Sequence, residues 1–208
     1  LFPLGFYLMM GFIMPEINPF FQETMIPAMI TFAILAATLL GLPDPLVNAR
    51  ENGIFRSYKI NGVPARSILF IPGLTTGLHL AIVTLIITFT APFLFDANLP
   101  GNGLNFFLTI VALSMACSGL GILIGVVSPS TRMTVLFSQV IFVPAMSLGG
   151  LMLPFDMLPE AAQTVAQLLP ATHAMNAFNG LAMGAAADFN PWASIIMLAT
   201  SGLLAFGL

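Results

Sequence analysis

Residues 104–127 read LNFFLTIVALSMACSGLGILIGVV, a stretch without a single charged side chain. A helix needs about 20 predominantly apolar residues to cross the hydrocarbon core of a bilayer, and there it must satisfy its own backbone hydrogen bonds. The stretch meets both requirements. It predicts a membrane-spanning helix and so decides the class of the protein.

The same composition extends over the whole chain. Of its 208 residues, 58% are hydrophobic and only 6% are charged, and the mean hydropathy is +1.01. Further apolar runs cover residues 25–42, 67–95, 133–153 and 192–208, while residues 1–14 read as the second half of a helix. We expect an all-α polytopic membrane protein with about six transmembrane helices, the first truncated, in a single domain over residues 1–208 that is cut at both ends.

Polar and glycine-proline breaks separate the runs. PEINPFFQET (15–24) is predicted to be a loop, and GLPDP (41–45) to start a new helix capped by Asp44. Pro72, Gly73 and Gly77 predict a bend, and Asn190 with Pro191 predicts the start of the last helix, where Trp192 suits an interfacial anchor.

Charge is distributed unequally between alternate loops. Arg50, Arg56, Lys59, Arg66 and Arg132 all fall on one side of the predicted membrane, whereas Glu16, Glu23, Asp96, Asp156, Glu160 and Asp188 fall on the other. The positive-inside rule makes the basic side cytoplasmic. With a net charge of −3 and this placement, we expect a lipid bilayer around the chain and no nucleic acid partner.

Four of the five positive charges lie in NARENGIFRSYKINGVPAR (48–66). Residues 45–60 can form an amphipathic helix with an apolar side of Val47, Ile54, Phe55 and Tyr58 and a charged side of Arg50, Glu51, Arg56 and Lys59. One interpretation is a topology anchor that touches anionic lipid. The other is a docking helix for the groove of a soluble protein.

A second unusual segment is FDMLPEAAQTVAQLLPATHAMNAFNGLAMGAAADFN (155–190). Pro159 and Pro170 bracket a short helical pattern that spans only roughly 16 Å, about half the hydrocarbon thickness. A second short pattern follows, with Thr172 as its expected cap and Met175 and Phe178 on one face. We expect a hairpin on the outer side whose first helix dips into the membrane or lies flat on it.

The sequence lacks the residues that a transporter needs to drive transport without a partner. It contains no G-x-x-x-x-G-K-[ST] loop for nucleotide phosphates, and no Asp, Glu, Lys or Arg lies in the middle of a predicted span. His79 is expected to be structural, paired with Thr75, Thr76 or a backbone carbonyl. Free energy is therefore expected to arrive from a soluble partner at the cytoplasmic face, and no enzymatic chemistry is expected in this chain.

Several further residues have two interpretations each. Gln139, with Phe142 and Met146, either faces a translocation path or bonds a neighbouring helix. The G-x-x-x-G pairs at 73/77, 121/125 and 180/184 favour packing within the chain over a dimer seam. Cys117 is expected to be a buried hydrophobe. Asp156, Glu160 and His173 fit no metal-ligand spacing, so no metal site is expected.

Three stretches, in this order, resemble the ABC-2 type permease family of ABC exporters. They are ARENGIFRSYKINGVPARSIL (49–69), SGLGILIGVVSPSTR (118–132) and GGLMLPFDMLPEAAQTVAQLLPATHAMNAFNGL (149–181). The resemblance covers nearly the whole chain, and its most specific element is the proline-rich hairpin after a Gly-Gly pair. Asn179 departs from the family pattern, which has a basic residue there, so the subfamily and the substrate stay open.

The resemblance implies a six-span permease half in the plasma (inner) membrane. It would work with a second permease subunit, identical or different, and with an ABC ATP-binding subunit that holds ATP and Mg²⁺, so that this chain needs no cofactor. The loop between the second and third helices would be the coupling helix, with Arg50, Glu51, Phe55, Arg56, Tyr58 and Lys59 in that role. The hairpin would be re-entrant and would form an outer gate marked by Pro154, Pro159 and Pro170.

The implied function is ATP-driven export. Because no charged or aromatic groove for a polymer is evident in the sequence, we expect a hydrophobic small molecule, such as a drug or antibiotic, as the cargo, while lipids, glycolipids and ions stay open. Two other classes stay open from the residues alone. One is an ion-gradient-driven carrier or channel, which would transport without an ATPase. The other is a membrane scaffold, which would bind a cytoplasmic partner without any flux.

Overall fold

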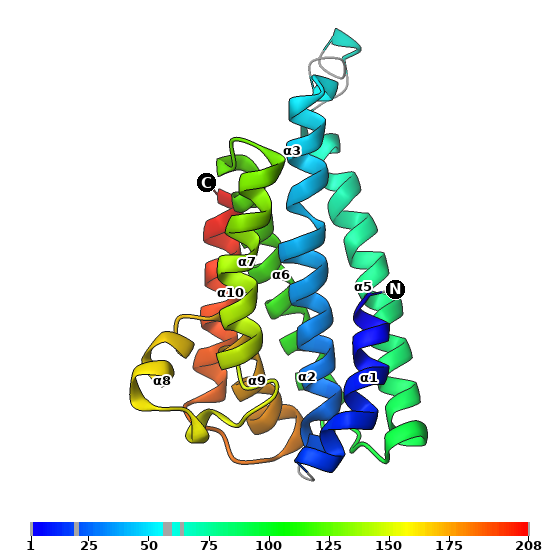
Figure 1. Ribbon diagram of the computed structural model, residues 1–208, viewed down its shortest axis with the longest axis vertical. Coiled ribbons are helices and arrows are strands. Elements are labelled where there is room, and N and C mark those ends of the chain that lie inside the picture. Colours follow the sequence, from blue (N-terminus) through cyan, green and yellow to red (C-terminus); the bar gives the residue numbers. More distant parts are fainter. Residues whose placement is uncertain (1, 19–20, 56–59, 63–64, 208) are drawn as a thin grey trace.

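The computed structural model describes residues 2–18, 21–55, 60–62 and 65–207, and this part of the chain contains helices and no strand. The elements in chain order, drawn in Figure 1, are α1 (Phe2–Ile17), α2 (Phe21–Leu35), the π-helical η1 (Ala36–Gly41), α3 (Pro43–Glu51), α5 (Ala65–Phe95), α6 (Gly103–Val127), α7 (Thr131–Leu148), the 3-10 turn η2 (Phe155–Met157), α8 (Glu160–Ala166), α9 (Pro170–Ala177), the π-helical η3 (Phe178–Met183) and α10 (Pro191–Gly207).

Four helical stretches are long and apolar enough to cross a membrane. They are Phe21–Glu51, Ile71–Phe95, Gly103–Val127 and Thr131–Leu148, while Phe2–Ile17 and Pro191–Ala205 are apolar but shorter. The all-helical membrane class is thereby confirmed. The count of six spans stays a prediction.

The helices lie side by side and divide the charges between two ends of the bundle (Figure 1). One end carries α3 and the turn from α6 to α7, and we call it the basic end because Arg50 and Arg132 lie there. The opposite end carries the α1–α2 turn, the α5–α6 turn, α8 and α9, and we call it the hairpin end. For the described residues, charges therefore separate as the loop count predicts.

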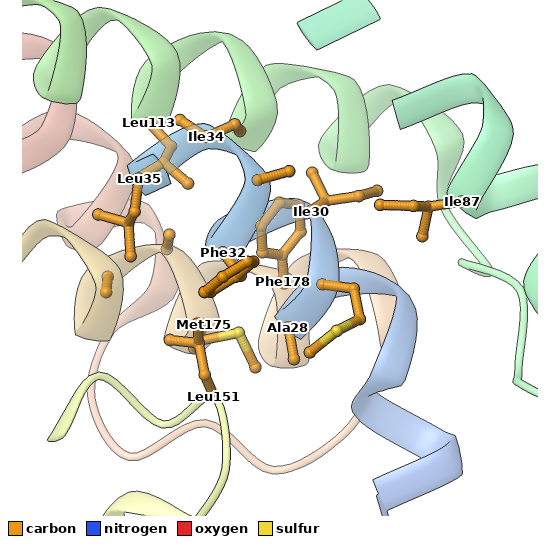
Figure 2. Close-up of a cluster of buried hydrophobic side chains, with 14 of the residues drawn as sticks. Ala28, Ile30, Phe32, Ile34, Leu35, Ile87, Leu113, Leu151, Met175 and Phe178 are labelled. Atoms are coloured by element: carbon orange, nitrogen blue, oxygen red, sulfur yellow. The ribbon is translucent and has the colours of Figure 1, made fainter. Parts of the chain in front are cut away.

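The core is built around α2, which is surrounded by other helices. In the membrane-length window of Phe21–Glu51, 83% of the residues are buried. Figure 2 shows Phe32 of α2 beside Met175 and Phe178, with Ile87 and Leu113 reaching the same cluster from α5 and α6. The Phe32 ring also lies 5.9 Å from the Phe142 ring of α7. The hairpin residues Met175 and Phe178 are thus part of the core.

Small residues set the closest helix contacts. A Cβ on Gly202 of α10 would lie 2.8 Å from the Met115 backbone of α6, and one on Gly119 of α6 would lie 2.7 Å from the Cβ of Ala205. Lipid offers helices no hydrophobic gain on association, so close van der Waals packing of this kind holds them together. The preference for packing within the chain is confirmed at Gly121 and Gly125, which face η1 and α3, respectively.

The predicted helix break at residues 41–45 is wrong. Leu42 keeps helical dihedral angles (φ −80, ψ −39), α3 begins at Pro43, and no side chain caps it, so Asp44 is not a cap. The wide turn η1 lies directly before Pro43 and Pro45. Prolines lack a backbone N–H and crowd the preceding turn, and a π-helical turn absorbs this conflict without ending the helix.

Three other features differ from the prediction. The loop at 15–24 is wrong in extent, because α1 runs through Pro15 to Ile17 and α2 starts at Phe21. α7 ends at Leu148 instead of Leu153, where Gly149 caps it and Gly150 takes φ +80. α5 is one helix through Pro72, Gly73 and Gly77, and the bend expected there stays a prediction. Thr172 is not a cap, because α9 begins at Pro170 after the N-cap Leu169.

The start of the last helix is confirmed. The Asn190 side-chain oxygen accepts from the backbone N–H of Trp192 at 3.0 Å, and Pro191 is the first residue of α10. The Trp192 side chain is about half exposed at the hairpin end of the bundle.

Candidate functional site

Arg50, in the last turn of α3, reaches across to the C-terminus of α6. Its Nη1 donates to the carbonyl of Val126 at 3.0 Å and to that of Gly125 at 3.5 Å, and its Nη2 donates to the carbonyl of Ser128. The last carbonyls of a helix have no partner within the helix and carry the negative end of its dipole. A guanidinium, whose donors form a planar fork, suits this position.

Glu51, the next residue, binds the N-terminus of α7. Its carboxylate accepts from the Thr131 hydroxyl at 2.7 Å and from the Thr131 backbone N–H at 3.3 Å. Thr131 is the first residue of α7, where free N–H groups and the positive end of the dipole favour an anion. Ser130 completes this start as the N-cap, accepting from Met133 N at 3.4 Å.

Two adjacent residues of opposite charge thus join three helix ends, and we call Arg50, Glu51, Ser128 and Thr131 the brace. Each charge meets the helix terminus of complementary sign, and each contact contributes about 0.3–1 kcal/mol. α3 packs along both α6 and α7. The end of α3 and the α6–α7 turn are therefore joined directly by hydrogen bonds.

The segment after the brace turns away from α3. The helix ends at Glu51, Asn52 is its C-cap, and Gly53 takes φ +68, a conformation that favours glycine. The predicted continuous helix over 45–60 is therefore interrupted at Asn52 and Gly53, while Ile54 and Phe55 are helical again. Ile54 is exposed and Phe55 is half-buried. Arg56, Tyr58 and Lys59 lie outside the described residues.

One expectation for the charged stretch is wrong. Val47 is expected on a contact surface, but its side chain is fully buried against the rest of the bundle. Arg50 and Glu51 are exposed, as expected, and both also make hydrogen bonds within the chain, in the brace. Sequence periodicity could not show this, because the partners lie more than 70 residues away.

An open groove of about 1060 Å³ lies between α5 and α6. Its walls are apolar except for the hydroxyls of Thr84, Ser114 and Ser118. Gly73 and Gly77, on the α5 side, have no atom within 4 Å of an added Cβ. Sequence reasoning missed this groove, although small residues at four-residue spacing on both helices were a signal for it.

The residues predicted for a translocation path are not brought together in that groove. Gln139 is exposed on α7, Phe142 is buried in the core, and Met146 is half-buried. His79 is exposed on α5, and the Thr75 hydroxyl donates to the Ile71 carbonyl at 2.9 Å. Cys117 is buried and free, as expected of a small hydrophobe.

At the hairpin end, each of the three prolines starts a short element. Pro154 precedes η2, Pro159 precedes the mostly exposed α8, and Pro170 opens α9. α9 is buried from Ala171 to Ala177 and packs against α2, α6, α7 and α10. The helix expected between Pro159 and Pro170 is present, whereas its re-entrant placement in a membrane stays a prediction.

Two carboxylates of the hairpin end face each other, Asp156 of η2 and Asp188 of the loop before α10. Burial of the Asp188 carboxyl, and then its hydrogen bond to Asp156 and the charge of that residue, raise the pKa of Asp188 to about 6. Among the described residues, no three His, Cys, Asp or Glu side chains are grouped to hold a metal.

The raised pKa predicts a pH-dependent stability. An ordinary aspartate, with a pKa of 3.8, loses its proton before the folded-state carboxyl with its pKa of about 6, so deprotonation favours the unfolded chain. The contribution of Asp188 to the free energy of unfolding is present in full below about pH 4 and is lost as the pH rises through about 6. The melting temperature of detergent-solubilised protein should fall over this window, and Asp188→Asn should flatten the fall.

The matched control for that measurement is Glu160→Gln, which removes a carboxyl of the same hairpin outside the Asp156–Asp188 pair. This variant should keep the pH dependence of the wild type. A wild-type melting temperature that does not change between pH 4 and pH 7 would contradict the assignment to Asp188.

Comparison with known proteins gives one family. The sequence profile described as ABC-2 type transporter matches residues 1–183 of the 208-residue chain. No curated protein and no solved structure gives a match. The matched range includes the brace, the α5–α6 groove and the hairpin through η3, all built on apolar helices of membrane-spanning character. The chain belongs to the ABC-2 type transporter family, as a membrane transport component.

Proposed function

We propose that this chain is the membrane-spanning permease subunit of an ATP-driven exporter. A separate ATP-binding subunit docks at the basic end, and the cargo leaves the cytoplasm toward the hairpin end. The observation that carries the proposal is the brace, because it links the end of α3 to both α6 and α7. Family membership supports the transport class, since ABC-2 permeases normally work with an ATP-binding subunit.

The brace gives a physical route for energy input. The segment from residue 52 to residue 62 follows the brace directly and exposes Ile54, with Phe55 half-buried beside it. A partner that binds and moves this segment displaces α3, and α3 displaces the α6–α7 turn through Arg50 and Glu51. This displacement shifts the permease from one conformation to another only if the two conformations differ in their contacts at Arg50 and Glu51. ATP and Mg²⁺ are held by the partner, since this sequence has no phosphate-binding loop.

The cargo proposed is a hydrophobic small molecule. The groove between α5 and α6 has a volume within reach of drug-sized ligands and mostly apolar walls. Its three hydroxyls provide a few polar contacts without a fixed charge. Such a surface suits a drug-like molecule better than a charged polymer.

A second permease subunit is proposed to pack on α7. Gln139 lies on an exposed face of this helix, together with the exposed Leu136, Val140 and Val143. An amide left among lipid chains lacks hydrogen-bond partners, so it favours a partner helix or water. The face with Gln139 then borders a path between two subunits, with Phe142 and Met146 behind it.

The coupling proposal predicts the behaviour of Phe55→Ala/Tyr58→Ala. In proteoliposomes with the ATP-binding subunit, this variant should hydrolyse ATP but lose about tenfold or more of its ATP-driven flux, because the partner loses its aromatic contacts at the basic end. Flux of a hydrophobic dye and phosphate release are measured on the same sample.

Phe93→Ala is the matched control, because Phe93 is 87% exposed and lies near the end of α5 opposite the basic end. This control should keep normal flux. Full flux in the double variant with normal membrane insertion would contradict the proposal, as would uphill transport by the chain alone on a proton or sodium gradient without nucleotide.

A further inference from the structure

The three hydroxyls of the α5–α6 groove lie near the middle of two membrane-length helices. Ser114 lies eleven residues after Gly103, the start of α6, and Thr84 lies eleven residues before Phe95, the end of α5. At 1.5 Å per residue, each is roughly 16 Å from the hairpin end of its helix, which is half the hydrocarbon thickness. Ser118 follows one turn further along α6.

The fold itself does not use these hydroxyls. On the same two helices, other hydroxyls donate to the carbonyl four residues earlier, namely those of Thr75, Thr90 and Thr109. None of the three groove hydroxyls makes a hydrogen bond with any described residue. The three side chains are half-buried, and none of their oxygens is among the enclosed unpartnered atoms, so each oxygen keeps accessible surface.

Membrane lipid supplies no partner at that depth. The polar groups of a lipid lie at the two bilayer surfaces, and the hydrocarbon core offers only CH₂ and CH₃ groups. A hydroxyl that stays among apolar atoms without a hydrogen bond is unfavourable. The middle of the groove therefore favours a molecule with hydrogen-bonding atoms at its own centre over an acyl chain.

The groove also carries no fixed charge. The residues that line it include no Asp, Glu, Lys, Arg or His, and the exposed His79 of α5 is not among them. An ionised group at the middle of a bilayer is costly unless it meets a partner of opposite charge. Hydroxyl dipoles in apolar walls therefore suit a neutral molecule and not an ion.

We propose that the groove selects neutral, elongated molecules whose carbonyl, ether or hydroxyl oxygens lie near the middle of an apolar body. Ser114 and Ser118, four residues apart on α6, bind two such atoms roughly 6 Å apart, and Thr84 binds from the α5 side. The inference rests on the proposed role of the groove as the cargo site. It excludes ions, and lipids whose polar groups lie only at one end, from the cargo.

The test is dye binding to the full chain in nanodiscs, without nucleotide or an ATP-binding subunit. Nile red is neutral and has ring heteroatoms and a carbonyl within its apolar body, diphenylhexatriene is an elongated hydrocarbon, and rhodamine 6G is a cation. Fluorescence is titrated against dye concentration, and the signal of empty nanodiscs is subtracted. Nile red should bind saturably, whereas the other two dyes should show only the linear partitioning that empty nanodiscs show.

Two variants assign the binding to the groove. Ser114→Ala/Ser118→Ala should weaken Nile red binding about fivefold or more, because two neutral hydrogen bonds are lost. Gly77→Leu should abolish it, because Gly77 lines the groove and has open space around an added Cβ, which the new side chain fills. Gly5→Leu is the matched control on α1. Its added Cβ also has open space, but Gly5 lies outside the groove, so this variant should bind as the wild type does.

Failure of this inference is distinguishable from failure of the proposed function. The inference is overturned by absence of saturable Nile red binding, by equal binding of either other dye, by unchanged affinity in the double serine variant, or by full binding in Gly77→Leu. None of these results contradicts ATP-driven flux in proteoliposomes. Selective Nile red binding without any ATP-driven flux would instead contradict the exporter role and support the selectivity of the groove.

Discussion

Replacing Arg50 by glutamate is expected to reduce ATP-driven flux to background while the chain still inserts in the membrane. The substitution places a carboxylate against the Gly125, Val126 and Ser128 carbonyls at the C-terminus of α6, where only a cation is favourable. The brace then breaks on one side, and α3 no longer moves α6. Flux in proteoliposomes is measured beside the ATPase rate of the partner.

Two companion variants separate geometry from charge. Arg50→Lys keeps the charge but offers a single ammonium instead of a planar fork, so it should retain only part of the flux. Arg132→Ala removes a positive charge from the same end, where the side chain is exposed, and should stay close to wild type. Equal losses in the Arg50 and Arg132 variants would show that net charge, and not the brace, decides the activity.

Replacing Gly121 by alanine is expected to cause a large loss of stability. The new Cβ would lie 2.3 Å from the Thr38 carbonyl oxygen, a backbone atom of η1 that cannot rotate away. α6 and the long α2–α3 helix must separate, at a cost of about 1–3 kcal/mol. The melting temperature in detergent should fall by roughly 3–10 °C.

Gly77→Ala is the control, and its expected change in stability has the opposite sign. It adds the same methyl group to another apolar helix, α5, but nothing lies within 4 Å of the added atom. A glycine inside a helix costs roughly 0.5–1 kcal/mol relative to alanine, so this variant should be as stable as the wild type or more stable. A fall in melting temperature equal to that of Gly121→Ala would refute the assigned close contact.

Local sequence signals predict most of the helices because each span is a continuous apolar run with its own caps. Residues 104–127 and the Asn190–Pro191 start match α6 and α10 closely. The errors occur where prolines lie within a helical stretch that continues past them. GLPDP has the composition of a break, yet tertiary packing on all sides of α2 holds the chain helical, and a wide turn makes this possible.

The candidate sites were less predictable because they depend on distant pairs. The sequence indicates that Arg50 and Glu51 belong to the energy-input end, but their partners, the turn carbonyls and Thr131, are about 75–80 residues away. Asp156 was considered with Glu160 and His173, its neighbours in sequence, while the structure pairs it with Asp188. Backbone carbonyls leave no sequence pattern, and carboxylate pairs across a hairpin leave only a weak one.

The wide turn η1 has a consequence for how the long helix Phe21–Glu51 tolerates change. A π-helical turn holds one residue more than an α-turn, and each residue rotates the following helix by about 100°. The azimuth of Arg50 around its helix is therefore decided at residues 36–41 and not by the buried half, α2, before them. Loss or gain of one residue in that turn would leave Arg50 itself unchanged and still point its guanidinium away from the carbonyls of the α6–α7 turn.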